Sequence, residues 1–289
     1  MKKIYKIIFC FLLLITLIGD DYSPSPLTIY FFDVGQADCS FLQLPNGENM
    51  LIDCGNTADG SRIVNQLSLL GVRQIDHLVI THPHEDHVGG ADNVLNSFFI
   101  KNIYTPKIKK EDLRDTICFK EFASTVKRLG LLVQDISAGD LIMRDGFLKI
   151  SCLSPYPQDY AELNEYSAVL EVVFYKNTIL FMADAEKINE NALLSEGSVP
   201  DCDIIKIGHH GSNSGTTKKF IKTAAPEYAI ITVGADNPYG HPDGRVLRRL
   251  YAQGTAIYRT DLCGTIVAES DGRHIKIHTT DICLDGDIS

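Results

Sequence analysis

The sequence is poor in basic residues: 27 Lys and Arg stand against 37 Asp and Glu, for a formal net charge of −10 over 289 residues. Proteins that coat nucleic acids bind phosphate mainly through Lys and Arg, so this deficit argues against that class. It does not exclude a nuclease, because metal ions and a local cluster of cations can meet phosphate at one site. Internal repeats and low-complexity tracts are also missing. With 45% hydrophobic residues, the composition indicates one ordinary globular catalytic domain.

A disulfide framework is missing as well, although the chain contains 8 cysteines. Without Cys10, which lies in an N-terminal apolar run, an odd number remains, and their spacing is not compact. Most lie inside apolar runs, as Cys152 does, where cysteine behaves as a small buried hydrophobic residue. Cys39 and Cys54 lie on strands that we expect to form one hairpin, so they are the expected single bridge.

Long apolar runs are confined to the N-terminus, where Lys2, Lys3 and Lys6 accompany residues 7–18. This run is short for a membrane span, and positive charge followed by an apolar stretch is the order of a signal peptide. The cleavage signal near residues 16–19 is poor, so a secreted and an N-terminally anchored protein remain equal alternatives. Both place the protein outside the cytoplasm. We expect a signal peptide or anchor at residues 1–20, a linker at 21–26 and the catalytic domain at 27–289.

The rest of the chain alternates short apolar strands with amphipathic helices. The first strands form hairpins, one of them across Asn46-Gly47, a strong hairpin signal. Later strands are interleaved with helices, which predicts two mixed sheets covered by helices. We expect strands at residues 27–33, 41–44, 50–53, 78–80, 131–133, 148–153, 168–174, 178–182, 204–207, 230–233, 256–258, 265–268 and 275–278, and helices at 63–70, 119–129 and from 243.

Residues 81–90 carry the densest group of chemically active side chains. His82, His84 and His87 lie with Asp86 within six residues, directly after the apolar run at residues 78–80. Imidazole nitrogens and carboxylate oxygens are ligands that suit zinc, manganese or iron. Open α/β sheets usually place their sites at the carboxyl ends of strands. The pattern therefore predicts a metal site rather than a His-rich surface loop.

Carboxylates near such a cluster often accept the second N–H of a ligating histidine and fix its tautomer. Asp53, at the end of the predicted hairpin, is a candidate for this role, with a turn residue as the alternative. Asp33 and Asp38 have the same two interpretations.

The cluster matches His-x-His-x-Asp-His, the hallmark of the metallo-β-lactamase fold superfamily, which the chain resembles. Its flanking motifs resemble the extracytoplasmic metallohydrolase domain of the ComEC family of DNA-uptake channel proteins. They follow that family's order from about residue 27 to residue 278. The motifs are Phe31-Phe32-Asp33-Val34-Gly35-Gln36-Ala37-Asp38, Leu51-Ile52-Asp53-Cys54-Gly55, Phe181-Met182-Ala183-Asp184, Ile207-Gly208-His209-His210-Gly211-Ser212 and Tyr239-Gly240-His241-Pro242. The resemblance implies an α/β fold, the αββα sandwich of two mixed sheets flanked by helices.

The resemblance also implies the roles of single residues. His82 and His84 would bind one metal, Asp86 and His87 a second, Asp184 would bridge both and His209 would complete the second site. Of the two adjacent histidines only one is needed as a ligand, which leaves His210 packed behind the site.

Two further residues are implied at the substrate. His241 would lie at the pocket rim and hold a phosphate or leaving group, with a helix cap as its alternative role. Ser212 and the loop after it offer hydrogen-bond donors to an anion.

One feature departs from many superfamily members: residues 155–183 contain no histidine to give the first metal a further ligand. Asn164 and Ser167 lie at the corresponding place, as in ComEC-type domains. We therefore expect one or two divalent ions of unequal affinity, zinc or manganese.

The ligand set predicts hydrolysis, because a bound cation activates water for attack on phosphorus or a carbonyl while Asp86 orients that water. A phosphodiesterase or nuclease acting on extracellular DNA is the leading hypothesis. The alternatives are a hydrolase of a lactone, thioester or β-lactam, and a non-catalytic metal-binding or partner-docking domain.

Overall fold

The structure is a computed structural model that describes residues 25–109, 111–281 and 283. The expected signal peptide or anchor and most of the expected linker lie outside these residues. Among the residues described, no helix has the length and apolar character needed to span a membrane.

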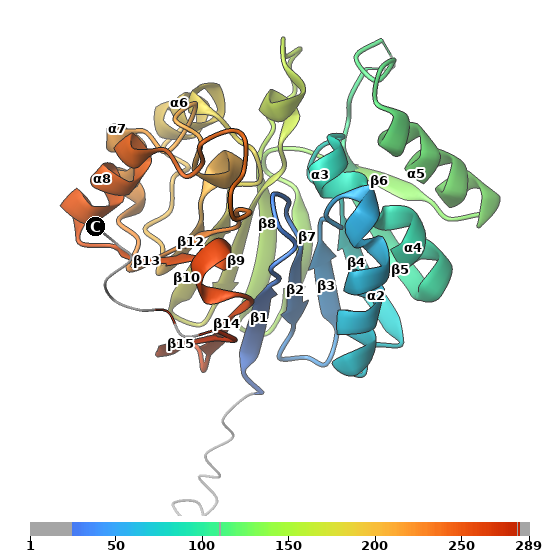
Figure 1. Cartoon of the computed structure of the whole chain (residues 1–289), viewed down its shortest axis with the longest axis horizontal. Helices are drawn as coiled ribbons and strands as arrows, with labels where there is room; N and C mark the ends of the chain where they lie inside the picture. The colour runs from blue at the N-terminus through green and yellow to red at the C-terminus, as the bar shows by residue number, and fades with distance from the viewer. Residues whose placement is uncertain (1–24, 110, 282, 284–289) are drawn as a thin grey trace, which may run out of the picture.

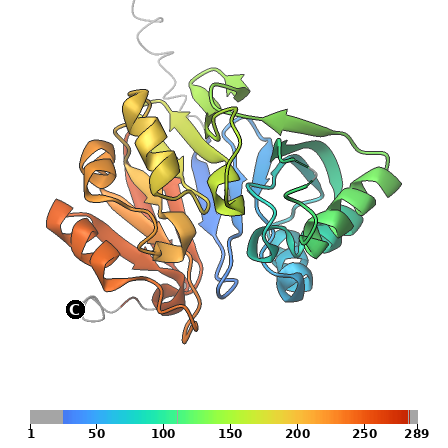
Figure 2. The same ribbon diagram turned by 90° about the horizontal axis from the view of Figure 1, so that it is seen from above.

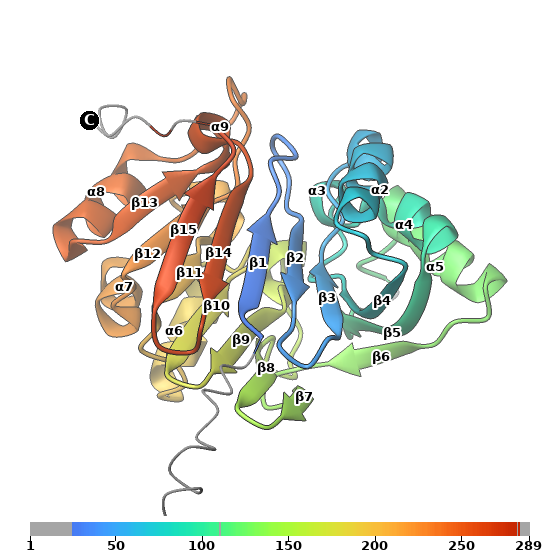
Figure 3. The ribbon, with the colours of Figure 1, turned by 90° about the horizontal axis from the view of Figure 1, so that it is seen from below.

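Two mixed β-sheets pack face to face, and helices cover their outer faces (Figures 1 and 2). The antiparallel strands of the first sheet lie side by side in Figure 3. The first sheet has eight strands in the order β15 (Ile275–Thr279), β14 (Ile266–Ser270), β1 (Leu27–Phe31), β2 (Ser40–Gln43), β3 (Asn49–Ile52), β4 (Gln74–Val79), β5 (Phe99–Pro106) and β6 (Val133–Ile136). The second has seven in the order β13 (Ala256–Arg259), β12 (Tyr228–Ile231), β11 (Ile204–Lys206), β10 (Asn177–Phe181), β9 (Val169–Phe174), β8 (Leu148–Ser154) and β7 (Leu141–Asp145).

The helices divide between the two outer faces. Those beside the first sheet are α2 (Gly60–Leu69), α3 (Glu85–Val88), α4 (Ala91–Ser97) and α5 (Ile117–Arg128). Those beside the second are α6 (Lys187–Ser195), α7 (Lys218–Ala224) and α8 (Gly244–Gln253). Short elements complete the chain: η1 (Thr57–Asp59), η2 (Leu163–Tyr166), η3 (Gly208–Gly211) and α9 (Thr260–Cys263).

Three hydrophobic clusters hold these layers together. Between the sheets, the rings of Phe31 and Phe181 stack with centroids 5.8 Å apart. Beneath the helices of the first sheet, Ile63 and Phe122 are buried, and Phe220 is buried beneath those of the second. Each such side chain contributes about 1.5–3 kcal/mol by leaving water. The three clusters correspond to the three interfaces of an αββα sandwich, so the predicted fold is confirmed.

The predicted disulfide is wrong. Cys39 and Cys54 are buried free thiols, and the bridge joins Cys263 to Cys283 instead. In the β2–β3 hairpin Ser40 pairs with Ile52, which aligns Cys39 with Asp53, one residue short of Cys54. The two cysteines do share a hairpin, as expected, but its register does not place them opposite each other.

The parallel half of each sheet positions the site. In the first sheet β3 and β4 run parallel, and in the second β10, β11 and β12 run parallel. The carboxyl ends of these strands meet at one edge of the sandwich, at the upper edge in Figure 1. The polar residues that follow each strand therefore converge at the seam between the two sheets.

Candidate metal centre

The histidine loop leaves β4 and turns at once into α3. His87 and His82 are buried, whereas His84 and Asp86 are partly exposed. Gly89 and Gly90 let this turn lie against the loop after β3, because a Cβ at either position would collide with the backbone of Thr57 or Cys54. The glycine pair therefore separates α3 from α4, which begins at Ala91.

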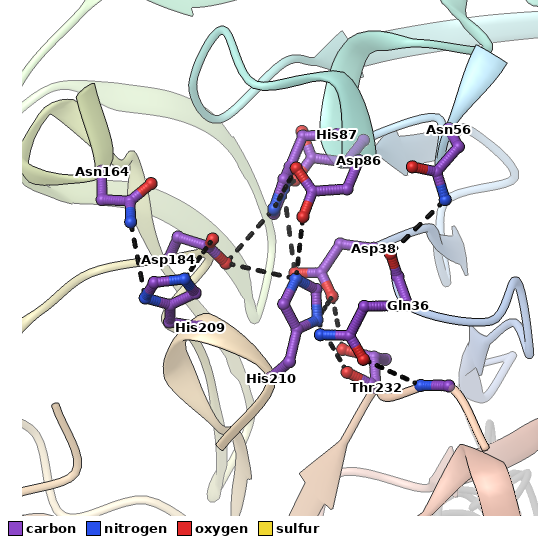
Figure 4. A network of polar contacts seen from close by, with 12 residues as sticks. Gln36, Asp38, Asn56, Asp86, His87, Asn164, Asp184, His209, His210 and Thr232 are labelled. Carbon is purple, nitrogen blue, oxygen red and sulfur yellow. Dashed lines mark hydrogen bonds and ion pairs between the residues drawn. The ribbon is translucent and has the colours of Figure 1, made fainter. Parts of the chain in front are cut away.

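A first group of four side chains gathers around Asp184. Asp86, His87, Asp184 and His210 each offer a ligand atom, and these atoms lie within 4.8 Å of one another. His87 Nε2 lies 3.2 Å from Asp184 Oδ1, and His210 Nε2 lies 3.2 Å from Asp86 Oδ2 (Figure 4). Two of these residues come from the first sheet and two from the second.

A second group contains His82, His84 and Asp86, whose ligand atoms also lie within 4.8 Å of one another. His82 Nε2 lies 3.8 Å from the Oδ2 atom of Asp184, while the Oδ1 atom faces His87. The two oxygens of Asp184 thus face the two groups separately, which is the arrangement a bridging carboxylate requires.

The donor set fits a divalent cation. Among the described residues, His82 Nε2, His87 Nε2 and Asp184 Oδ1 are buried and have no hydrogen-bond partner. His87 Nε2 and Asp184 Oδ1 are close, but they are not aligned for a hydrogen bond. Leaving a buried polar atom unpaired costs about 1–3 kcal/mol. One or two cations among these atoms would satisfy all three.

The electrostatics of the cluster also favour a bound cation. Burial alone would lower the pKa of His87, but the carboxylates of Asp184, Asp53 and Asp86 raise it well above its usual value. Burial alone would raise the pKa of Asp184, but His87 and His210 hold it well below its usual range. Burial and the nearby His87 lower the pKa of His82. The concentrated negative charge thus attracts a cation, with a proton on His87 as its competitor.

The two adjacent histidines differ from our expectation. His210, not His209, lies in the four-residue group, and its Nδ1 is 2.8 Å from the carbonyl oxygen of Thr232. His209 Nε2 lies 3.6 Å from Asp184 Oδ2, the oxygen that also faces His82. Both residues adopt the left-handed conformation, with φ of 49° and 52° in η3. That turn decides which ring enters the group, and the sequence pattern gives no signal of it.

Asp53 lies behind the cluster, as expected. Its Oδ2 is 2.7 Å from Nδ1 of His87 and accepts a hydrogen bond from the Thr81 hydroxyl at 2.6 Å. Its Oδ1 accepts from the Thr81 backbone N–H at 2.8 Å. Burial raises the pKa of this carboxyl, although His87 opposes the shift. The contact directs Nε2 of His87 toward Asp184.

A buried ion pair crosses the seam beside the cluster. The Asp38 carboxylate accepts hydrogen bonds from Lys206 Nζ and from the Thr232 hydroxyl, and it lies 3.5 Å from His210 Nδ1. Lys206 also donates to the carbonyl of Ala183 at 3.2 Å. Sequence reasoning left Asp38 ambiguous and missed Lys206. The signal was available: Lys206 is a lone cation inside the apolar run that forms β11.

Four other predicted residues have clear positions. Ser167 is buried, and its hydroxyl accepts a hydrogen bond from the backbone N–H of Asp184 at 3.2 Å. Asn164 Nδ2 lies 3.2 Å from Glu186 Oε1 and 3.4 Å from His209 Nδ1. The Ser212 hydroxyl accepts from the backbone of Ser214. Asp33 belongs to neither group: its carboxylate accepts from Gly35 N and pairs with Arg62 at 3.6 Å.

A cavity of about 540 Å³ opens onto the two groups. His241 is at its wall, with its ring edge-on to His209 at 5.7 Å and stacked on Tyr239 at 5.7 Å. Burial and the nearby His209 lower the pKa of His241. Asp243, rather than His241, caps α8.

The cavity is lined by Gln36, Asn56, His84, Glu85, Asp86, Asn164, Asp184, His209, His210, Pro238, Tyr239 and His241. Of these, Asn56, Glu85 and Pro238 escaped sequence reasoning because nothing in their spacing separates them from ordinary loop residues. Gln36 and Tyr239 belong to the quoted motifs, but we had assigned them no role.

Comparison with known proteins adds sequence relatives. A family profile described as "Metallo-beta-lactamase superfamily" matches residues 32–234. ComE operon protein 3 of Bacillus subtilis is 29% identical over 252 residues, covering 81% of this chain and 32% of that protein. Recombination protein 2 of Haemophilus influenzae is 28% identical over 241 residues, covering 81% of this chain and 28% of that protein. The chain thus spans about a third of the length of these relatives.

Solved structures share the fold at low sequence identity. The CmlA beta-hydroxylase E377D mutant has a TM-score of 0.57 at 17% identity, covering 84% of this chain and 54% of that one. Igni18, a metallo hydrolase of Ignicoccus hospitalis, has a TM-score of 0.52 at 14% identity, covering 84% of this chain and 98% of that one.

Proposed function

From the premise that this chain belongs to the metallo-β-lactamase superfamily, we propose that it is a metal-dependent phosphodiesterase acting on DNA. Superfamily membership and the His and Asp groups make the chain a metallohydrolase with a site for divalent metal. The observation that carries the proposal is the placement of Asp184 between two ligand groups. Two adjacent cations suit the displacement of an oxygen from phosphorus, where both the attacking and leaving oxygens carry charge.

We assign His82, His84 and Asp184 to one ion, and Asp86, His87, His210 and Asp184 to the other. His209 lies beside the first group, with its Nε2 3.6 Å from Asp184 Oδ2 and its Nδ1 3.4 Å from Asn164 Nδ2. When bound, the cations lower the pKa of water and neutralise charge on the phosphate. Zinc and manganese both suit this mixed nitrogen and oxygen set, and the first group, with three ligands against four, should bind its ion more weakly.

The side chains at the cavity have separate tasks. Asp86 faces the cavity, and its pKa lies far below its usual value, so it is a carboxylate that orients the attacking water. His241 is neutral at neutral pH because its pKa is lowered. Its ring lines the cavity, where it can meet a phosphate oxygen or the leaving oxygen. Ser167 and Asp53 hold Asp184 and His87 in place.

Support for a nucleic-acid substrate comes from the relatives. One of them is named Recombination protein 2, and Competence protein ComA of Neisseria gonorrhoeae is 29% identical over 237 residues, covering 81% of this chain and 31% of that protein. A third, ribonuclease Z of Archaeoglobus fulgidus, is 28% identical over 107 residues, covering 35% of this chain and 33% of that protein, and its name describes a phosphodiester substrate. These names favour phosphodiesters over lactones, thioesters and β-lactams. A non-catalytic role is disfavoured by the four-residue group, which opens onto a cavity.

The test is a substrate panel on the full-length chain supplied with zinc or manganese. We expect hydrolysis of bis-p-nitrophenyl phosphate and DNA, and none of a β-lactam or a lactone. Asp86→Ala and His210→Ala should abolish hydrolysis and lose metal by elemental analysis. His274→Ala is the matched control, because His274 is exposed and pairs with Asp271 on the surface. Lactam or lactone hydrolysis without diester hydrolysis would contradict the proposal.

We also propose that the protein works outside the cytoplasm, on the strength of the N-terminal sequence alone. A phosphatase reporter joined after Pro26 should be active in cells. An inactive reporter, with the protein in the cytosol, would rule out export and remove the case for extracellular DNA.

A further inference from the structure

A second cavity, of about 360 Å³, has no part in the proposed chemistry. Its walls are largely apolar, and they include Tyr156, Tyr166, Ile136 and Pro155. Lys107 and Lys109 lie among its polar residues. The volume falls within the range of about 300–1,000 Å³ that is typical of small-molecule sites.

This cavity adjoins the metal centre through one short helix. Asn164 and Tyr166 both belong to η2, and Asn164 lines the cavity at the metal groups whereas Tyr166 lines the second cavity. The two cavities thus share η2 as a common wall.

The walls of the cavity are fixed before any ligand binds. The ring of Tyr166 meets that of Tyr160 edge-on at 5.1 Å, and its hydroxyl donates to Asp112 at 3.0 Å. The Tyr160 hydroxyl accepts from the backbone N–H of Tyr156 at 3.1 Å. A preformed cavity costs little ordering entropy when it is filled, which favours a flat, rigid ligand.

The charges indicate what kind of flat ligand fits. Lys109 is neutralised by Asp159 at 2.5 Å. Among the described residues Lys107 forms no ion pair, and it is exposed at the cavity wall. Asp135 also lines the cavity, so its four charged side chains sum to zero. The exposed Lys107 is the cation that can meet a phosphate while a base stacks on the aromatic side chains.

We propose that this cavity binds the base of the nucleotide next to the cleaved phosphodiester, so that the preferred substrate is a single-stranded polynucleotide. The proposal rests on the function proposed above. A base held in a duplex must first be unpaired and unstacked to enter a cavity, at a cost of a few kcal/mol. An unpaired strand avoids that cost, which gives the preference for single strands.

Kinetics with matched small diesters test the proposal on the full-length, metal-loaded chain. Thymidine 5′- and 3′-p-nitrophenyl phosphates carry a base, whereas bis-p-nitrophenyl phosphate does not. We expect kcat/KM for one thymidine ester to exceed that for bis-p-nitrophenyl phosphate by about tenfold or more, from base stacking. Tyr156→Ala should lower that ratio toward one, and the matched control Tyr175→Ala, on the β9–β10 turn, should leave it unchanged. Equal ratios for wild type and Tyr156→Ala would overturn the inference.

A binding measurement covers the case in which Tyr156→Ala fails to fold or the wild type cleaves no diester. The chain contains no tryptophan, so Gln158→Trp places a single reporter at the exposed edge of the cavity. Thymidine 5′-monophosphate should quench it saturably, and deoxyribose 5-phosphate should not. Tyr175→Trp should show no saturable quenching. Equal quenching by both ligands, or none, would overturn the base site. An inactive wild type with saturable quenching by the nucleotide alone would refute the phosphodiesterase while leaving the base site standing.

Discussion

Replacing Lys206 with methionine should lower the free energy of unfolding by about 3–5 kcal/mol, because it leaves the buried carboxylate of Asp38 without its cation. The side chains of Lys206 and Asp38 are only 3% and 6% exposed. Methionine fills most of the space of lysine, so the loss comes from charge rather than from a void. Asp38 keeps its hydrogen bond from Thr232 and its proximity to His210, which places the expected loss toward the lower end of the range.

The measurement is urea-induced unfolding of the full-length chain in the presence of a chelator, which removes any contribution from bound metal. Lys101→Met is the matched control. It breaks a pair with Glu48 at 2.8 Å whose side chains are 50% and 30% exposed, and such pairs contribute about 0–1 kcal/mol. Asp38→Leu combined with Lys206→Met should recover part of the loss, since no unpaired charge remains. A Lys206→Met variant as stable as Lys101→Met would refute the reasoning.

Three other variants test the ligand groups. Asp53→Asn should weaken metal binding about 10- to 100-fold, because His87 loses the carboxylate that orients its ring; unchanged affinity in a chelator competition would contradict this. Asn164→His adds an imidazole beside His209 and Asp184, so it should tighten the weaker of the two binding steps in a calorimetric metal titration. An unaltered weak step would count against our assignment of the first group. Ser167→His, in contrast, overpacks a fully buried position and should cost about 1–3 kcal/mol in urea unfolding, so a variant of wild-type stability would show that the site is not tightly packed.

Strands were predictable where burial is uniform. Apolar runs identified β8 to β12 because both faces of these strands are covered. The exposed edge strand β7 escaped because its residues are mostly exposed or only partly buried, and β5 escaped because Lys101 and Asn102 interrupt its apolar pattern. In α6 the buried residues include Asn189 and Glu190, which break the apolar periodicity of a helix. Both are held by hydrogen bonds to distant loops, which sequence spacing cannot reveal.

The site was predictable to the extent that its residues are adjacent in sequence or follow an apolar strand. His82, His84, Asp86 and His87 share one turn, and their grouping needs no knowledge of the fold. The choice between His209 and His210 depends on backbone angles, and the contact of Asp38 with Lys206 joins residues 168 positions apart. Long-range geometry of this kind is set by how the sheets pack, which no local pattern encodes.

The cluster draws its ligands from both sheets, so a bound cation is also a cross-link between them. A ligand that binds only the folded chain raises its stability by RT ln(1 + [L]/Kd), about 2.7 kcal/mol at a hundredfold excess over Kd. By reciprocity, anything that loosens the packing of Phe31 against Phe181 should weaken metal affinity without touching a ligand. The hydrophobic interface and metal binding are thus thermodynamically linked, and in metal-poor surroundings the chain would lose bound metal and resistance to unfolding together.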